Sequence, residues 1–165
     1  MINHSEKHVH APLLPESPQL LVRISRQTME VVHGRQVMTT YPVSTSKFGP
    51  GFEPGSFKTP LGRFIVSKKF GRDAPAGTVF KARCPTGEIA GEGGEEDLIL
   101  TRILWLEGLD PKNANTRDRY IYIHGTNHES QIGSPASCGC VRMRNEDIIA
   151  IFDQIAEGTQ VEIFE

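Results

Sequence analysis

The residues best suited to chemistry lie in one segment, YIYIHGTNHESQIGSPASCGCVRM, which runs from residue 120 to residue 143. It contains His124, His128, Cys138 and Cys140, which are two of the six histidines and two of the three cysteines in the chain. These side chains could bind a metal, form a redox pair, or act as a nucleophile with its base. The spacing of these residues favours some of these alternatives over others.

A metal site or a redox pair fits the spacing poorly. Two histidines and two cysteines match the ligands of a structural zinc, but the cysteines of such sites are usually separated by about two to four residues. Here only Gly139 separates Cys138 from Cys140, and redox motifs also favour a longer separation. His124 and His128 would share a face of a helix, yet Gly125 and the polar residues after it indicate a loop. We therefore expect no metal and no cofactor, although neither alternative is closed.

A purely structural role is the simplest interpretation of any single cysteine or histidine, because both are often packed in protein cores. The combination argues against it. Cys140 follows Gly139 and the sequence SPAS, and Arg142 comes two positions later. Such a loop presents a residue at the surface of a site.

Nucleophilic catalysis explains more of these features at once. A free thiol with a pKa of about 8.5 is mostly protonated at neutral pH, so Cys140 needs a base. We expect His124, at the end of a strand, to take the proton and leave a thiolate–imidazolium pair. Gly125 would let a backbone carbonyl hold the imidazole in one tautomer. Gly139 would let the chain approach a substrate, so that backbone N–H groups at Cys138 and Gly139 stabilise an oxyanion.

Most of the elements that must position these residues read as strands. The apolar residues alternate from Leu20 to Ile24, and His33-Gly34-Arg35 has the character of a hairpin turn. Strands are predicted at 20–24, 29–32, 36–44, 64–66, 98–106, 120–124 and 161–163, and loops at 45–56, 85–97 and 107–119. The acidic 85–97 segment is expected to be flexible.

One helix is expected, late in the chain. Asn145 is a favourable N-cap, and Gly158 should end the helix. The apolar positions Ile148, Ile149, Phe152 and Ile155 form a single stripe. Many short strands with one helix predict a mainly β protein, a sandwich or a barrel, with long loops around the site.

Length and charge point to a single ordinary domain. The 165 residues carry a net charge of −2, which gives no reason to expect nucleic acid as a partner. Residues 1–18, with His4, His8 and His10, are predicted to be a flexible tail before a domain at 19–165.

There is no apolar run of membrane-spanning length and no signal-like core, so we expect no membrane partner and a cytoplasmic location, or a periplasmic one if a leader is missing. Three cysteines argue against a disulfide framework, and the oligomeric state stays open.

The segment HGTNHESQIGSPASCGCVRM resembles the active-site motif of the L,D-transpeptidase catalytic domain, or YkuD, family. The motif has H-G-T, a gap, and then S-x-G-C-[VI]-R-[ML], and the spacing from His124 to Cys140 is typical. The segments YPVSTSKFG, KTPLGRF, LEGLD and RYIYIHGT resemble other parts of the family, so that residues 20–165 are covered. Many members have histidine at the position of Cys138, which puts the fine tuning of the site in doubt.

The resemblance implies a YkuD-like fold in which Cys140 attacks a peptidoglycan stem tetrapeptide, with His124 as its base. The bond between the L-centre of the third residue, usually meso-diaminopimelate, and the terminal D-Ala would break, leaving a thioester on Cys140. Carbapenems would acylate the same sulfur. The resemblance also implies substrate contacts for Arg142, Tyr122 and Ser137, although a structural role for Arg142 is an equal alternative.

The motif does not identify the acceptor. A cytoplasmic enzyme would meet muropeptides during recycling, so we expect hydrolysis by an L,D-carboxypeptidase. The alternative is a transpeptidase that forms 3→3 cross-links, and a more distant one is a non-catalytic peptidoglycan-binding domain. His128 is expected to be a solvated loop residue.

Overall fold

The computed structural model describes residues 17–165. Within this range the chain is mainly β, and ten strands form one sheet. His4, His8, His10 and nearly all of the predicted tail lie outside the described residues, so that tail and the boundary at residue 19 stay predictions. The strands are β1 (Gln19–Arg23), β2 (Thr28–His33), β3 (Gln36–Ser44), β4 (Gly62–Phe70), β5 (Thr78–Lys81), β6 (Cys84–Ile89), β7 (Ile99–Gly108), β8 (Tyr122–Gly125), β9 (Val141–Met143) and β10 (Gln160–Phe164).

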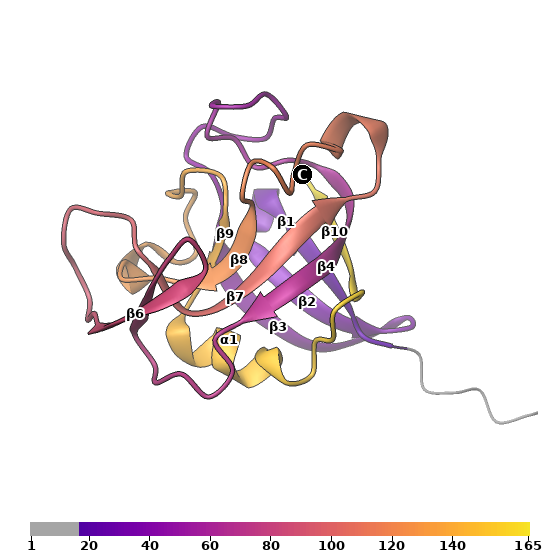
Figure 1. Cartoon of the computed structure of the whole chain (residues 1–165). Helices are drawn as coiled ribbons and strands as arrows, with labels where there is room; N and C mark the ends of the chain where they lie inside the picture. The colour runs from indigo at the N-terminus through magenta and orange to yellow at the C-terminus, as the bar shows by residue number, and fades with distance from the viewer. Residues whose placement is uncertain (1–16) are drawn as a thin grey trace, which may run out of the picture.

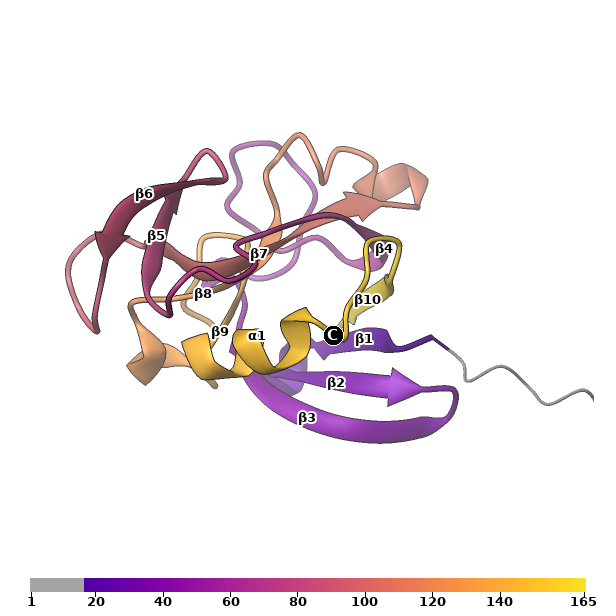
Figure 2. The ribbon, with the colours of Figure 1, turned by 60° about the horizontal axis from the view of Figure 1, so that its bottom comes forward.

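The sheet closes into a barrel, as the fold class predicted from the sequence allows. The strand order is β4-β10-β1-β2-β3-β9-β8-β7, and a further pairing of β4 with β7 closes the ring. Most neighbours are antiparallel, but β1 pairs with β10 and β8 pairs with β9 in parallel. The β5–β6 hairpin extends the sheet beyond β7 and stands out from the barrel wall (Figures 1 and 2).

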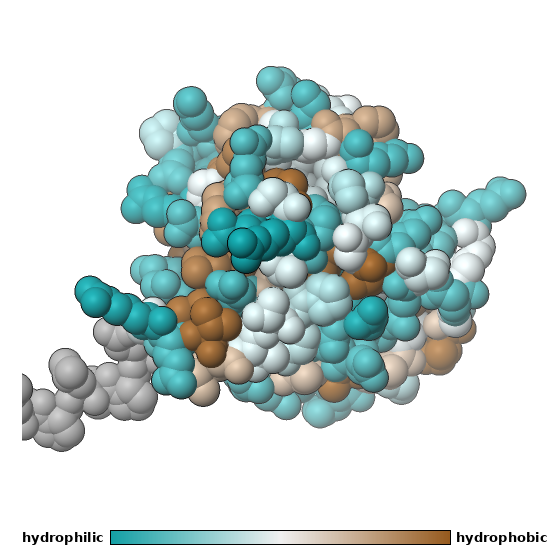
Figure 3. Space-filling model, turned by 180° about the vertical axis from the view of Figure 1, so that it is seen from behind, coloured by the Kyte–Doolittle hydropathy of each residue, from teal (hydrophilic) through white to brown (hydrophobic). Residues whose placement is uncertain are grey.

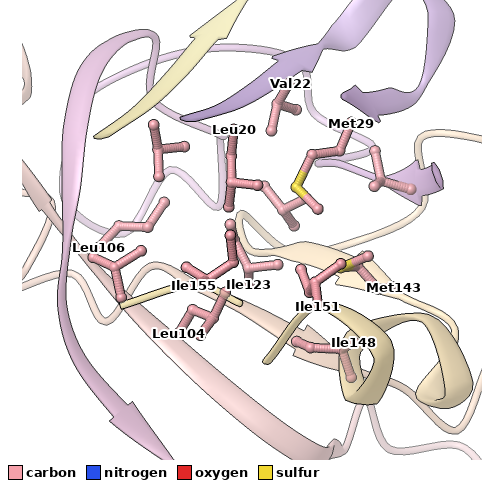
Figure 4. Packing of buried hydrophobic residues seen from close by; sticks show 14 of the residues in the cluster. Leu20, Val22, Met29, Leu104, Leu106, Ile123, Met143, Ile148, Ile151 and Ile155 are labelled. Atoms are coloured by element: carbon pink, nitrogen blue, oxygen red, sulfur yellow. The ribbon is translucent and has the colours of Figure 1, made fainter. Parts of the chain in front are cut away.

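The barrel interior is filled by alternating residues from every strand of the ring. Fully or almost fully buried side chains include Leu20, Val22, Met29, Val43, Phe64, Val66, Leu104, Leu106, Ile123, Val141, Met143, Val161 and Ile163. Figure 4 shows Leu20 and Val22 on one side of this core, with Leu104 and Ile123 opposite. Because successive strand residues point to opposite faces, the intervening residues of β7, β8 and β9 face out of the barrel.

The helix α1 (Asn145–Phe152) covers the barrel core with Ile148, Ile151 and Phe152 (Figure 4). Two details predicted from the sequence are wrong. Asn145 is the first helical residue, and Arg144 holds the N-cap position without a side-chain cap. The Glu129 carboxylate instead accepts the Asn145 N–H at 2.7 Å, so the helix start is capped from a distant loop.

The helix also ends earlier than predicted. It stops at Phe152, well before Gly158, and Ile155 is buried in the core from the segment that follows. Gly158 has a φ of +90° in the turn that leads into β10. The Gly158 and Val66 backbones are hydrogen-bonded at 2.7 Å, so this glycine serves the return to the sheet and not the end of the helix.

Other differences concern short segments. Part of the predicted 85–97 loop is β6, while β5 and β9 were not predicted. β8 begins at Tyr122 because Tyr120 has a left-handed backbone with a φ of +56°. The described chain also has three short 3-10 helices, at Ile24–Arg26, Pro111–Asn113 and Glu129–Gln131. Strand pairing across the fold, which local sequence does not report, decides these short elements.

The face of the molecule in Figure 3 is largely hydrophilic, and its apolar side chains are scattered in small groups. Exposed large apolar residues such as Met38, Phe57 and Ile89 belong to loops, hairpins and the strand β3. In the described part of the chain, α1 is the longest helix, and no helix has the length and hydrophobicity that crossing a membrane requires.

The packing of the barrel core predicts a large effect of truncation. Replacing Leu104, which is fully buried, by alanine should lower the free energy of unfolding by about 3 kcal/mol, because it leaves a cavity among close-packed neighbours. Urea unfolding followed by circular dichroism measures the change. The control is Leu109→Ala, at a leucine that is 48% exposed and should change stability by less than about 0.5 kcal/mol. Equal losses in the two variants would contradict this account of the core.

Candidate active site

The parallel pair of strands β8 and β9 brings the histidine and the cysteine together. Ile123 pairs with Val141 and His124 pairs with Arg142, which places Cys140 beside Tyr122 at the entry of β9. Ile123 and Val141 point into the barrel core. The side chains of His124 and Cys140 therefore lie on the same outward face of adjacent strands, one strand repeat apart along the pair.

The sulfur of Cys140 is held by two backbone groups. The Tyr122 N–H donates to Sγ at 3.3 Å, and the thiol donates to the Tyr120 carbonyl at 3.5 Å. The left-handed backbone at Tyr120 presents that carbonyl to the sulfur. Cys140 is half-buried and packs against an outer apolar cluster that includes Ile103, Tyr122 and Trp105.

Burial raises the pKa of the Cys140 thiol to about 12. The Tyr122 N–H and the Arg119 guanidinium favour the thiolate, and the Asp97 carboxylate opposes it. The environment therefore favours a neutral thiol in the resting protein. This differs from the thiolate–imidazolium pair expected from the sequence, because the sequence does not show that Cys140 packs against an outer apolar cluster.

His124 is almost completely buried, and its ring is oriented by the next residue. Its Nδ1 lies 2.6 Å from the Gly125 carbonyl oxygen. Because that oxygen can only accept, Nδ1 carries the proton, and Nε2 keeps a lone pair that can accept one. Burial lowers the pKa of His124, the Gly125 carbonyl and Asp97 partly oppose this, and Arg142 adds to it. The imidazole is therefore neutral and available as a base.

Gly125 is required by close packing as well as by the turn of its carbonyl. A Cβ at this position would lie 2.3 Å from the Asn145 Oδ1 and 2.7 Å from the Leu100 carbonyl oxygen. Asn145 in turn donates from Nδ2 to the Thr126 carbonyl at 2.8 Å and accepts from the Thr101 hydroxyl at 2.5 Å. Asn145 thereby joins the start of α1 to β7, which neighbours His124 in the sheet, and to the segment that follows His124 in the chain.

The turn that presents Cys140 is stabilised by Ser137. This residue is fully buried, donates to the Cys140 carbonyl at 2.6 Å and accepts the Gly139 N–H at 3.3 Å. Gly139 has a φ of +121°, and a Cβ there would press on the Lys58 carbonyl at 3.3 Å. Cys138 is exposed. Ser137, expected to touch substrate, thus shapes the turn, and the Gly139 N–H predicted for an oxyanion is already engaged by the serine.

Arg142 lies on the outward face of β9 beside His124, but surrounding loops cover it. It is 1% exposed, and its guanidinium bonds Asp97 at 3.1 Å, the Gln131 side chain at 2.9 Å and the Ser44 hydroxyl at 3.3 Å. Its Nε has no partner among the described residues. These contacts correspond to the structural alternative for Arg142, since they tie the loop before β7 to the loop after β8. Tyr122 lines the site with its backbone and its ring.

Two charged residues near the sulfur were not singled out from the sequence. Arg119 donates to the Lys58 carbonyl at 2.7 Å and to the Gly51 carbonyl at 3.3 Å, so it fixes the 49–59 loop while its charge favours the Cys140 thiolate. Asp97 accepts a hydrogen bond from the Arg142 guanidinium, and its negative charge raises the pKa of His124. The position of Arg119 directly before Tyr120 in the RYIYIHGT segment could have indicated that it lies near the site. Asp97 belongs to a run of acidic residues, and nothing in the sequence distinguishes it from its neighbours.

The acidic loop is attached to the segment after His124. Asn127 donates to the Gly93 and Glu96 carbonyls at 2.8 and 2.9 Å, and the His128 Nε2 lies 2.8 Å from the Gly94 carbonyl oxygen. His128, which is half-buried, thus also contacts this loop. Residues 17–165 contain no group of three or more histidine, cysteine or acidic side chains arranged to hold a metal ion.

The fold is a closed, mainly β barrel, and its candidate site is a histidine and a cysteine on one outward face of two adjacent strands. The family model described as "YkuD: L,D-transpeptidase catalytic domain" matches residues 17–163. The chain therefore belongs to the YkuD family of L,D-transpeptidase catalytic domains, and it is an enzyme of this family.

Curated relatives agree with this assignment. The putative L,D-transpeptidase YqjB of Bacillus subtilis is 32% identical over 150 residues, which cover 90% of this chain and 72% of that protein. The probable L,D-transpeptidase YcfS of Escherichia coli is 29% identical over 160 residues, and the match covers 92% of this chain but only 46% of YcfS.

Solved structures share the fold at low identity. The L,D-transpeptidase LdtMt1, solved in complex with imipenem, superposes with a TM-score of 0.58 at 19% identity, over 90% of this chain and 59% of that one. An L,D-transpeptidase from Mycobacterium smegmatis gives a TM-score of 0.58 at 16% identity, with 90% and 59% coverage. The chain spans about three fifths of the length of these chains.

The electrostatics of the sulfur predict the pH dependence of its reactivity. Because the pKa of Cys140 lies at about 12, its thiolate fraction should grow about tenfold per pH unit between pH 7 and 10. The rate of alkylation by iodoacetamide, followed at the Cys140 peptide by mass spectrometry, should grow in proportion. Cys140→Ala identifies the signal from the other cysteines. A rate that is flat from pH 7 to 9 would instead indicate a preformed thiolate–imidazolium pair.

The packing of Gly125 predicts a site defect from one methyl group. Gly125→Ala should shift the Asn145 side chain and the carbonyl that holds His124 Nδ1, and so lower the kcat of any Cys140-dependent reaction at least about 100-fold. The matched control is Gly91→Ala, because a Cβ at Gly91 meets no atom within 4 Å. Steady-state kinetics compares the two variants, and unchanged kcat in Gly125→Ala would refute the close contact.

Proposed function

We propose that Cys140 is the nucleophile and His124 its general base in an acyl transfer from a peptidoglycan stem tetrapeptide. The scissile bond joins the L-centre of the third residue, a diaminopimelate, to the terminal D-Ala. The observation that carries the proposal is the arrangement of β8 and β9. It sets a tautomer-fixed imidazole and a thiol on the same outward face.

The proton follows a path that these two residues can supply. Nε2 of His124 removes the thiol proton as Sγ attacks the scissile carbonyl, and the same proton then passes to the nitrogen of the departing D-Ala. The C–N bond breaks, and the tripeptide stays on Cys140 as a thioester. A resting thiol with a raised pKa and a histidine with a lowered pKa suit this concerted route, since neither group must exist in its charged form beforehand.

Backbone groups around the sulfur support the transition state. The Tyr122 N–H, which contacts Sγ at 3.3 Å, stabilises negative charge on the sulfur as the proton leaves. Stabilisation of the oxyanion is assigned to the backbone at Cys138 and Gly139, and the Gly139 N–H would exchange its long contact with Ser137 Oγ for the oxyanion.

An acceptor then releases the thioester, with His124 taking a proton from it. The names of the relatives, which are described as putative or probable L,D-transpeptidases, favour an amine of a second stem and therefore 3→3 cross-linking. Hydrolysis by an L,D-carboxypeptidase in muropeptide recycling, and a cytoplasmic location, stay predictions of the sequence. Cell fractionation tests the location, and the products of the reaction distinguish the two acceptors.

The proposal predicts a defined set of products. Incubation with a disaccharide tetrapeptide should release D-Ala and give a 3→3 dimer or a tripeptide, and intact-protein mass spectrometry should detect the thioester on Cys140. Cys140→Ala should abolish all products. Cys84→Ala is the matched control, because Cys84 is exposed on β6, and its activity should stay within about twofold of the wild type.

Each product pattern has one interpretation. Dimer supports a transpeptidase, tripeptide without dimer supports a carboxypeptidase, and the absence of any Cys140-dependent product refutes the proposed function. Binding of the tetrapeptide without turnover would indicate a peptidoglycan-binding domain.

A further inference from the structure

Three arginines near Cys140 have no acidic partner. Among the described residues the salt bridges join Arg63, Lys68, Arg72 and Arg142 to carboxylates, and none involves Arg83, Arg117 or Arg119. The donors of Arg119 go to two backbone carbonyls and the Ser56 hydroxyl of the 49–59 loop. Arg83 and Arg117 instead lie against an aromatic group beside the proposed nucleophile, which raises the question of what their charges serve.

Arg83 occupies a strained position at the tip of the β5–β6 hairpin. Lys81 pairs with Cys84, so Ala82 and Arg83 form the whole two-residue turn. Their φ angles are +46° and +63°, in the left-handed region that such turns normally fill with asparagine and glycine. Each costs roughly 1 kcal/mol of backbone strain relative to glycine. An exposed turn that keeps alanine and arginine at this cost points to a use for the side chain.

The guanidinium of Arg83 is held in place without being neutralised. Its Nη1 donates to the Tyr122 hydroxyl at 3.0 Å, and its Cζ lies 4.4 Å from the centre of the Trp105 ring and 5.3 Å from that of Tyr120. Trp105 itself stacks on Tyr120 and meets Tyr122 edge-on. Among the described residues, Arg83 makes no other side-chain hydrogen bond. Its remaining N–H donors are thus free to form a bidentate contact with a carboxylate.

The contact of Arg83 with the Tyr122 hydroxyl, and not with the sulfur, indicates which substrate carboxylate fits. The Tyr122 N–H touches Cys140 Sγ at 3.3 Å, whereas Arg83 meets the hydroxyl at the far end of the same residue. Arg83 therefore contacts the opposite end of the residue whose backbone N–H contacts the sulfur. The carboxylate of the departing D-Ala is one carbon from the scissile nitrogen and stays close to the sulfur. A carboxylate at the end of a long side chain on the third residue spans the gap.

We propose that Arg83 is a specificity-determining residue that binds the distal side-chain carboxylate of the donor's third residue. It would select a stem with diaminopimelate over one with lysine, whose side chain ends without a carboxylate. The inference rests on the proposed function and adds to it the residue that distinguishes these two classes of stem peptide. Arg83 lies in the turn of a hairpin outside the barrel, so its substitution should leave the barrel and the β8–β9 pair intact.

Three tetrapeptides test the proposal on the full chain. They carry at the third position meso-diaminopimelate, its distal carboxamide, or L-lysine, and kcat/KM for Cys140-dependent release of D-Ala is measured for each. The wild-type enzyme should prefer the free diaminopimelate about 10- to 100-fold over the other two, the usual effect of one charge-assisted contact. Arg83→Gln should lose that preference by slowing only the diaminopimelate substrate, and Arg83→Lys should retain part of it.

The matched control is Arg117→Gln. Arg117 places its Cζ 4.8 Å from the centre of the same Trp105 ring and carries the same charge, but it does not bond the Tyr122 hydroxyl. Its substrate preference should equal that of the wild type. An Arg83→Gln enzyme that loses activity equally on all three peptides, or keeps the wild-type preference, overturns the inference and leaves the proposed function standing. No Cys140-dependent release of D-Ala from any peptide overturns both.

Discussion

The parallel pairing of β8 with β9 is the constraint on which the candidate site depends. Parallel neighbours keep the same residues on the same face, so the core positions Ile123 and Val141 fix the outward direction of His124 and Cys140. A shift by one residue in β9 would turn the cysteine into the barrel. The long connection from residue 126 to 140 is therefore closed at both ends, by Asn145 on the Thr126 carbonyl and by Ser137 on the Cys140 carbonyl. The barrel core thus determines the register, and the register determines the site.

Burial of this face has opposite consequences for the two groups. Burial raises the pKa of Cys140 and lowers that of His124, so both groups favour their neutral forms at rest. The nearby charged groups that could stabilise the ionised forms of Cys140 and His124 are engaged by other partners. Asp97 forms an ion pair with the buried Arg142, and Arg119 is directed to backbone carbonyls. In the proposed mechanism, proton transfer from Cys140 to His124 is coupled to attack on a bound substrate, so the thiolate forms when the substrate is present.

The sequence predicts this site unevenly, and the reason is the range of the interactions. The mainly β fold, the hairpin at Gly34 and the existence of α1 follow from local patterns and turn residues, and the structure confirms them. Where the sequence-based prediction differs from the structure, the role of the residue depends on partners that are distant in the sequence. Asn145 has the residue type of an N-cap, but Thr126 and Thr101 use its side chain while Glu129 caps the helix. The burial of Arg142 and Ser137 likewise follows from loops far away in sequence, as does the position of Arg119 beside the sulfur.

The arrangement separates rigid parts from adjustable ones. His124 and Cys140 belong to strands whose opposite face is close-packed, so their geometry is as well fixed as the core itself. Arg83, which we propose to contact the periphery of the substrate, sits on the β5–β6 hairpin, which projects from that wall (Figure 2). The strain at Ala82 and Arg83 is confined to a turn outside the barrel, where a loss of roughly 1 kcal/mol per residue does not disturb the core. The cation at this turn contacts the Tyr122 hydroxyl and the rings of Trp105 and Tyr120, so the proposed substrate preference can change there without altering Cys140 and His124.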